Sequence, residues 1–322
     1  MTAPIVRIAT RASALALWQA NHIADRLRQL PAAPVVELVE VVTIGDQNQT
    51  DALRQFGGTG VFTREVQRAV LDGRADLAVH SLKDLQTEPT EGLTLAAVPA
   101  RAPRFDALLL PHPDASDAAN AGSLPSISSL DDLPPRARIG TGSPRRQAQL
   151  LHLRPDLQLL EIRGNVDTRL KKLDEGQYDA IILAEAGLRR LGLDGRISLL
   201  LAPPLLLPAV GQGALGLEAR SDDQTIGDLL RQLEDPATRQ EITAERTLLH
   251  TLRAGCHAPL GVRTEITNEI LELNAVILSL DGAERIATTV TGEAVLAERI
   301  GRIAAERLLK WGAAKLLQTN GS

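Results

Sequence analysis

The chain has 322 residues, 44% hydrophobic and only 2% aromatic, and its 35 basic and 40 acidic residues leave a formal net charge of −5. Net negative charge with few aromatic residues excludes the basic, base-stacking surface typical of nucleic-acid-binding proteins. The single cysteine excludes an internal disulfide, and the most apolar segment, 197–210, carries three prolines and is too short to span a bilayer.

These exclusions leave a cytoplasmic protein of two or three domains, and its first hundred residues predict alternating strands and helices. Strands are expected at 5–10, 35–44, 75–80 and 93–98, and helices at 14–30 and 62–71. Ser13 is placed to cap the first helix. The buried strand 75–80 ends abruptly at Ser81, Lys83 and Asp84, and a proline-marked crossover, RAPRFDALLL, leads from 101 into a later strand.

The opening pattern returns after a loop or insertion at 111–135 that is rich in Asp, Ser, Ala and Pro. A strand is expected at 138–141 and a helix at 145–153, with Ser143 as its N-cap and Pro144 at its first position. Strands at 157–162 and 178–184 follow, and the second leads into the helix of AGLRRLGL. Because IATRAS at 8–13 and IGTGSPRR at 139–146 share a strand–turn–helix opening, the sequence predicts two similar α/β halves.

The pattern of predicted strands and helices changes beyond residue 222. Before that point VGQGALGLEAR predicts a strand with flanking glycines. We interpret VGQG (210–213), like GGTG (57–60), as hinge or mobile-loop glycines, because neither is followed by the lysine of a phosphate-binding loop. Beyond it, a helix at 239–252 ends in the tight loop LRAGCHAPLG, which holds the only cysteine, Cys256. Strands at 270–280 and 283–291 and a helix at 294–317 complete a small α+β unit.

Polar residues that directly follow strands are the candidate site residues, because ligands of open α/β sheets bind at the carboxyl ends of the strands. This set comprises Thr10, Arg11, Ser13, Ser81, Lys83, Asp84, Thr141, Ser143, Arg145, Arg146, Arg163, Arg169 and Arg190. Arginine in the first turn of a helix opposes the helix dipole, so Arg145 and Arg146 are expected to be ligand groups. Together the cations suit several carboxylates or phosphates; the alternative is that each is a solvated surface residue.

Three further residues each have two interpretations. Asp84 either stabilises a developing cation or shuttles a proton, or it is a helix cap or an ion-pair partner of Lys83. Cys256 is either a small buried hydrophobe or a thiolate used as nucleophile or attachment point. His80 alternates with apolar residues in its strand, which favours a hydrogen-bonded core histidine over a base. No spacing typical of a metal site is visible in the sequence.

Several motifs occur in one order along almost the whole chain: IATRASALALWQA, VHSLKDL, GTGSPRRQAQL, RGNVDTRLKKLDEGQYDAIILAEAGLRRLGL, LPAVGQGALGLEAR and AGCHAPLG. In this order they resemble the porphobilinogen deaminase (hydroxymethylbilane synthase) family. The resemblance implies two periplasmic-binding-protein-like α/β lobes with a central cleft, plus a small α+β C-terminal domain. It divides the chain into domain 1 (1–101 plus 208–232), domain 2 (102–207) and domain 3 (233–322).

The resemblance also implies an activity. Such an enzyme adds four porphobilinogen units in turn to a dipyrromethane cofactor, each with loss of ammonia, and water then releases hydroxymethylbilane. Cys256 would hold the cofactor through a thioether, and the enzyme would be a monomer. Asp84 would stabilise the azafulvenium cation that remains when ammonia departs.

Each pyrrole carries two carboxylates, and the resemblance assigns residues to them. The cofactor would contact Ser81, Lys83, Thr141, Ser143, Arg145, Arg146, Arg169 and Arg190. The incoming substrate would contact Arg11, Ser13, Phe62, Arg163 and Arg169. The chain departs from the family pattern at Thr59, where a lysine is common, at Gly142 to Pro144, and at His257 and Ala258. Residues 111–128 resemble an insertion.

Two other classes of protein remain as alternatives from the same residues. The arginine-rich cleft also suits a non-catalytic, two-lobed anion-binding protein. The lone thiol also suits a cysteine hydrolase that pairs Cys256 with His80 or His257.

Overall fold

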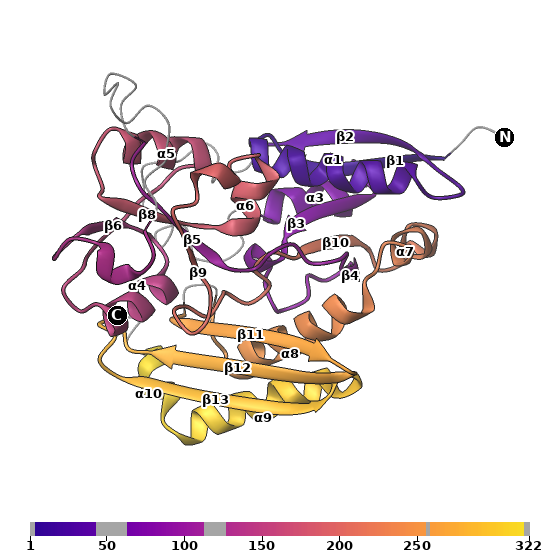
Figure 1. Ribbon diagram of the computed structural model, residues 1–322. Helices are drawn as coiled ribbons and strands as arrows, with labels where there is room; N and C mark the ends of the chain where they lie inside the picture. The colour runs from indigo at the N-terminus through magenta and orange to yellow at the C-terminus, as the bar shows by residue number, and fades with distance from the viewer. Residues whose placement is uncertain (1–3, 43–62, 113–126, 256–257, 319–322) are drawn as a thin grey trace.

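Three β-sheets organise the computed structural model, which describes residues 4–42, 63–112, 127–255 and 258–318 (Figure 1). Two of them are the centres of α/β lobes, and the third belongs to a C-terminal unit below both lobes in the view of Figure 1. This arrangement confirms the predicted fold class, two α/β lobes and a small α+β unit.

The sheet of the first lobe has the strand order β2-β1-β3-β10-β4. β1 runs parallel to β2 and β3, whereas β10 is antiparallel to β3 and β4. Its strands are β1 (Ile5–Arg11), β2 (Val35–Val41), β3 (Leu77–Ser81), β4 (Leu93–Ala97) and β10 (Leu215–Arg220). Helices α1 (Ala14–Arg28), α3 (Arg64–Leu71) and α7 (Gln224–Arg231) cover it. Two apolar clusters, one under α1 and α7 and one under α3, bury the two faces of the sheet.

The sheet of the second lobe repeats this order as β7-β6-β8-β5-β9, which confirms the prediction of two similar halves. β6 runs parallel to β7 and β8, and β5 is antiparallel to β8 and β9. Its strands are β5 (Asp106–Leu109), β6 (Arg138–Gly140), β7 (Gln158–Leu160), β8 (Ala180–Ala184) and β9 (Leu199–Leu201), and its helices are α4 (Pro144–Leu153), α5 (Val166–Asp174) and α6 (Glu185–Arg190).

The chain crosses between the lobes before β5 and again before β10, and the two crossovers lie against each other. The Ala102 N–H donates to the Gly213 carbonyl at 3.2 Å. Gly213 has φ +87°, and a Cβ there would lie 2.5 Å from the Ala102 oxygen. Gly211 has φ +70°, and a Cβ there would lie 2.7 Å from Leu82. The glycines of VGQG are buried and allow close backbone packing, which does not fit a mobile loop. The alternative interpretation of VGQG as a hinge stays a prediction.

The C-terminal unit packs α8 (Pro236–Thr251) and α9 (Ala297–Lys310) on an antiparallel sheet, β11-β12-β13. Its strands are β11 (Leu260–Thr267), β12 (Ile270–Leu278) and β13 (Arg285–Glu293). The sequence analysis predicted no strand at β11. The closing helix predicted at 294–317 is divided, because Gly312 adopts φ +99° between α9 and α10 (Ala313–Gln318).

Candidate active site

A cavity of about 360 Å³ opens between the two lobes beside the second crossover. It collects most of the predicted site residues from the ends of strands and the starts of helices. Arg11, Ser13, Ser81, Lys83, Asp84, Arg146, Arg163, Arg169 and Arg190 all line it. The crossover contributes Gly211, Gly213 and Ala214 to the same wall. The expectation that these residues meet at the carboxyl ends of strands is therefore confirmed as a matter of placement.

Lys83 and Asp84 reach the cavity on a short 3-10 turn, η2 (Leu82–Asp84), that directly follows β3. Leu82 is buried, and its N–H donates to the Ala214 carbonyl at 3.1 Å, which fixes the turn to the crossover. The Asp84 side chain is exposed to the cavity. Burial lowers the pKa of Lys83, against the opposing effect of the Asp84 charge. This turn therefore presents one carboxylate and one ammonium group side by side.

The first helix of the first lobe begins at the cavity. Ser13 is its N-cap, as predicted, and its Oγ accepts the Ala16 N–H at 3.4 Å. Ser81, at the end of β3, accepts a hydrogen bond from Gln19 Nε2 at 2.7 Å through its Oγ. Both hydroxyls are thus held in place by α1, whose N-terminus is a favourable site for an anion.

Two arginines of the second lobe, Arg169 and Arg190, line the cavity and bond backbone carbonyl groups. Arg169 donates Nε to the Gly164 carbonyl, and Arg190 donates Nη2 to the Gly213 carbonyl, each at 2.8 Å. The Arg190 guanidinium also lies 5.6 Å from the centre of the Trp18 ring on α1. Burial lowers the pKa of both guanidinium groups to about 10. Within the described ranges Lys83, Arg169 and Arg190 form no ion pair, so the cavity holds unbalanced positive charge.

The adjacent arginines of α4 have different environments. Asp106, at the start of β5, is buried between them and accepts hydrogen bonds from both. Arg145 donates Nη1 to Asp106 at 2.6 Å and to the Leu207 carbonyl at 2.8 Å, and it does not line the cavity. Arg146 lines it. Arg145 and Arg146 were expected to be ligand groups because of the helix dipole. Asp106 is a protein carboxylate that binds both of them, and their binding to a ligand stays a prediction.

Three other predictions concern residues away from the cavity lining. Thr141 is buried, and its Oγ1 accepts the Ser143 N–H at 3.3 Å. Ser143 occupies the N-cap position of α4 but makes no side-chain capping bond, whereas Pro144 stands at the start of the helix as predicted. His80 is a core residue, as predicted: it is buried, and its Nε2 lies 3.0 Å from Glu218 Oε2.

Several predicted residues lie outside the described part of the chain, namely Thr59, Phe62, Cys256 and His257. Asp106, Trp18 and Gln212 contact residues of the site but were not among the predicted site residues. Asp106 carried a usable signal, because a carboxylate that begins an apolar, buried strand needs a cationic partner. Trp18 and Gln212 carried none.

The described ranges contain no group of three or more His, Cys, Asp or Glu side chains that could hold a metal ion. None of the helices in the described ranges is both long and apolar enough to cross a membrane.

The chemistry of the cavity fits a ligand with several carboxylates. Lys83, Arg146, Arg169 and Arg190 approach it from both lobes, and three of them have no carboxylate partner among the described residues. Half-buried charge of this kind is unfavourable unless it is paired, so a polyanionic ligand is the expected counter-charge. A dipyrromethane group, with two carboxylates on each ring, satisfies this requirement.

Comparison with solved structures finds distant likenesses, of which two serve as examples. The periplasmic VFT2 domain of Bordetella pertussis BvgS matches 72% of this chain and 87% of its own length, with 15% identity and a TM-score of 0.42. A sulfonate-binding protein from Methylobacillus flagellatus matches 79% and 69%, with 17% identity and a TM-score of 0.38. At such scores the likenesses say nothing about ligands.

Sequence comparison is far more specific. Residues 6–228 match the family model "Porphobilinogen deaminase, dipyromethane cofactor binding domain", and residues 239–310 match "Porphobilinogen deaminase, C-terminal domain". The porphobilinogen deaminase of Maridesulfovibrio salexigens is 44% identical over 97% of both chains. That of Legionella pneumophila (strain Paris) is 44% identical over 99% of both chains. With two family models and these relatives matching nearly its full length, the chain belongs to the porphobilinogen deaminase family.

Proposed function

We propose that the chain is a hydroxymethylbilane synthase, which condenses four porphobilinogen units head to tail with loss of ammonia. The observation that carries this proposal is the cavity between the lobes, where Asp84 stands among cations of which Lys83, Arg169 and Arg190 form no ion pair with a described residue. A polycarboxylate substrate supplies the missing negative charge. Asp167 also lines the cavity, and Asp84 is the carboxylate to which we assign the chemistry.

Binding is assigned to the cations and the hydroxyls of the cavity. Lys83, Arg146, Arg169 and Arg190 pair with acetate and propionate groups, as do Arg11 and Arg163. Ser13 and Ser81 add hydrogen-bonding oxygens at the N-terminus of α1. Guanidinium groups suit this task because their planar N–H groups match a carboxylate in two-point contact. Phe62, Thr141, Ser143 and Arg145 remain assigned by resemblance.

Asp84 is assigned the chemistry. When ammonia leaves porphobilinogen, positive charge spreads onto the pyrrole nitrogen, and a carboxylate at that nitrogen stabilises the charge and accepts its N–H hydrogen bond. The η2 turn holds Asp84 at the cavity wall through Leu82 and the Ala214 carbonyl. The negative charge of Asp84 in turn opposes the lowering of the Lys83 pKa by burial.

The family's dipyrromethane cofactor supplies a covalently held primer to which substrate units are added. We assign its attachment to Cys256, the only thiol in the chain. Lys83, Arg146, Arg169 and Arg190 hold its carboxylates, and they do so from both lobes, so that the lobes close around it. These residues orient the primer and exclude water from its surroundings.

We further propose the division into domain 1 (1–101 plus 208–232), domain 2 (102–207) and domain 3 (233–322), which follows the three sheets. The protein is proposed to be a cytoplasmic monomer. A single cysteine suits a reducing compartment. Size-exclusion chromatography with light scattering checks the oligomeric state, since a dimer would have twice the mass of the 34.5 kDa chain.

Intact mass and turnover test the function together. The purified protein is expected to be heavier than its 34.5 kDa sequence by one dipyrromethane, and Cys256→Ala is expected to remove the added mass. Asp84→Asn is expected to keep the fold and to lower bilane formation at least about 100-fold, because it removes the charge that stabilises the cation. Near-normal bilane formation by Asp84→Asn would refute this role.

The same measurements separate the alternatives. A non-catalytic anion-binding protein would carry no adduct when made in a host that produces porphobilinogen. A cysteine hydrolase would lose activity with a small thiol reagent and keep it in Asp84→Asn. A hydrolase that used His80 would need an accessible ring nitrogen, but His80 is buried in the first lobe, with its Nε2 3.0 Å from Glu218 Oε2.

A further inference from the structure

The second crossover carries a buried glutamine that belongs to none of the roles assigned above. Gln212 is 1% exposed and stands between the two glycines that line the cavity wall. Its Nε2 donates to the Arg104 carbonyl at 2.8 Å and to Asp106 Oδ1 at 3.0 Å. It therefore connects the two crossovers to the carboxylate that balances the arginine pair.

Asp106 Oδ1 is also the oxygen that holds Arg146. Arg146 donates Nε and Nη2 to this one atom, and it donates Nη1 to the Ile182 carbonyl at 2.9 Å. A guanidinium group has five N–H donors, so one N–H on Nη1 and one on Nη2 remain. These two donors are left for a ligand carboxylate. Arg145 has no such role here, because it does not line the cavity.

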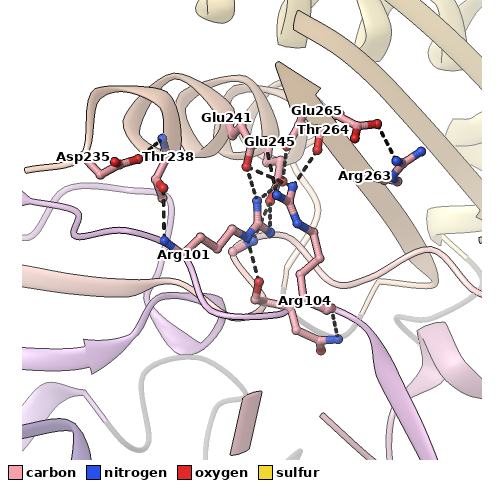
Figure 2. Close-up of polar contacts among 11 residues, drawn as sticks. Arg101, Arg104, Asp235, Thr238, Glu241, Glu245, Arg263, Thr264 and Glu265 are labelled. Carbon is pink, nitrogen blue, oxygen red and sulfur yellow. Dashed lines mark hydrogen bonds and ion pairs between the residues drawn. The ribbon is translucent and has the colours of Figure 1, made fainter. Parts of the chain in front are cut away.

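The Gln212 segment is fixed in turn by the C-terminal unit. Glu245 on α8 is fully buried and accepts the Gly211 N–H at 2.8 Å. It also accepts two hydrogen bonds from Arg101, whose Nε donates to the Gln212 carbonyl at 2.9 Å. Figure 2 shows Arg101 and Arg104 extending from the first crossover toward Glu241 and Glu245. The backbone of Gln212 is thereby held on both sides by one carboxylate.

We propose that Gln212 is a positioning residue for the anion site: by bonding Asp106 Oδ1 it orients the carboxylate that aims Arg146 into the cavity. Because Glu245 fixes its backbone, Gln212 also links the docking of α8, which leads to the Cys256 loop, to the geometry of Arg146. This inference rests on the proposed function for the identity of the ligand.

A double-mutant cycle tests the role. Gln212→Met keeps the size of the side chain and removes its donor, and it is expected to raise the KM for porphobilinogen about fivefold to tenfold with kcat within about twofold. In an Arg146→Lys background, which has already lost the planar guanidinium group, the same change is expected to alter KM less than about twofold. In an Arg163→Lys background its full effect is expected, because Arg163 does not contact Asp106.

Gln149→Met is the matched control. Gln149 is also buried, and its side chain bonds the Leu207 carbonyl and N–H. It makes no hydrogen bond to Asp106. It is expected to lower stability as Gln212→Met does and to leave KM unchanged. Additive effects of Gln212→Met and Arg146→Lys, or a Gln212→Met variant that loses stability alone, would overturn the positioning role.

Ligand binding is measured in parallel from the rise of the unfolding midpoint with added porphobilinogen, a readout that needs no turnover. A wild-type chain that porphobilinogen stabilises but that produces no bilane would refute the proposed function. The double-mutant cycle could then still be measured from ligand binding. A wild-type chain that turns over but gives an additive cycle would refute only the role of Gln212.

Discussion

Arg146 places two of its donors, Nε and Nη2, on the single Oδ1 atom of Asp106, at 2.9 and 2.7 Å. Arg145 reaches both oxygens of the same carboxylate from the preceding position of α4. Two guanidinium groups therefore share one buried anion and retain a net charge of about +1, counting each group as fully ionised at neutral pH. That residual charge lies at the wall of the cavity, beside Lys83.

Asp106→Asn is expected to destabilise the protein by about 3–5 kcal/mol, because it leaves two buried guanidinium groups without a counter-charge. Chemical denaturation measures the loss. Asp228→Asn is the control, since Asp228 pairs with Arg231 on the exposed face of α7, where an ion pair contributes about 0–1 kcal/mol. Equal effects of the two changes would show that the arginine pair does not depend on Asp106.

Arg169→Gln is expected to stabilise the ligand-free protein while it weakens the site. Burial lowers the pKa of Arg169 to about 10 from its ordinary 12.5, so the charged form at pH 7 is less favourable in the fold than in the unfolded chain. Removing the charge is expected to add about 1–2 kcal/mol to the free energy of unfolding. The KM for porphobilinogen is expected to rise about tenfold, because a ligand carboxylate loses its partner.

Thermal unfolding in a Cys256→Ala background, which is expected to carry no dipyrromethane, and steady-state kinetics with Cys256 in place measure the two effects of Arg169→Gln. Arg68→Gln is the control, because Arg68 is exposed on α3 and pairs only at 3.8 Å with Asp72. It is expected to change the free energy of unfolding by less than about 0.5 kcal/mol. A less stable Arg169→Gln protein would mean that the guanidinium group is paired within the ligand-free fold.

Substrate affinity is expected to fall as the pH rises toward about 10. In the ligand-free protein burial lowers the pKa of Arg169 and Arg190 to about 10, and that of Lys83 below its ordinary value. A bound carboxylate favours the charged forms and raises these pKa values, so binding takes up protons where the free cations have begun to lose them. KM should therefore be flat near neutral pH and rise on the alkaline side. A KM that falls with rising pH would contradict this.

The sequence was sufficient for the architecture of the lobes and for the composition of the cavity wall. Strands such as β3 are apolar and end at polar residues. The apolar run predicted the strand, and the rule that ligands bind at the carboxyl ends of strands then predicted Ser81, Lys83 and Asp84 as site residues. The prediction missed β11, although its residues alternate between more buried and more exposed positions over much of its length. The reason is that its first residues belong to the motif LRAGCHAPLG, which was interpreted as a loop.

The pairing of the arginines could not be predicted. Arg146 and Asp106 are 40 positions apart, on a helix and a strand that the fold of the second lobe brings together. The same reason hides Gln212, which lies 106 positions from its partner. A sequence pattern reports local periodicity, whereas these contacts depend on where two crossovers meet.

Gly211→Ala is expected to impair catalysis through the backbone of the turn that carries Asp84. Gly211 has φ +70°, and an added Cβ would lie 2.7 Å from Leu82 Cδ2 and 3.1 Å from the Lys83 nitrogen. The left-handed conformation alone costs about 1–2 kcal/mol for alanine, and the contacts add to it by displacing η2.

Gly176→Ala is the matched control, because Gly176 has φ +74° with no atom within 4 Å of an added Cβ. Denaturation and bilane kinetics compare the two: Gly176→Ala should lose about 1 kcal/mol of stability and no activity, whereas Gly211→Ala should lose more stability and about tenfold or more in kcat. Equal kcat values for the two variants would show that the crossover does not position Asp84.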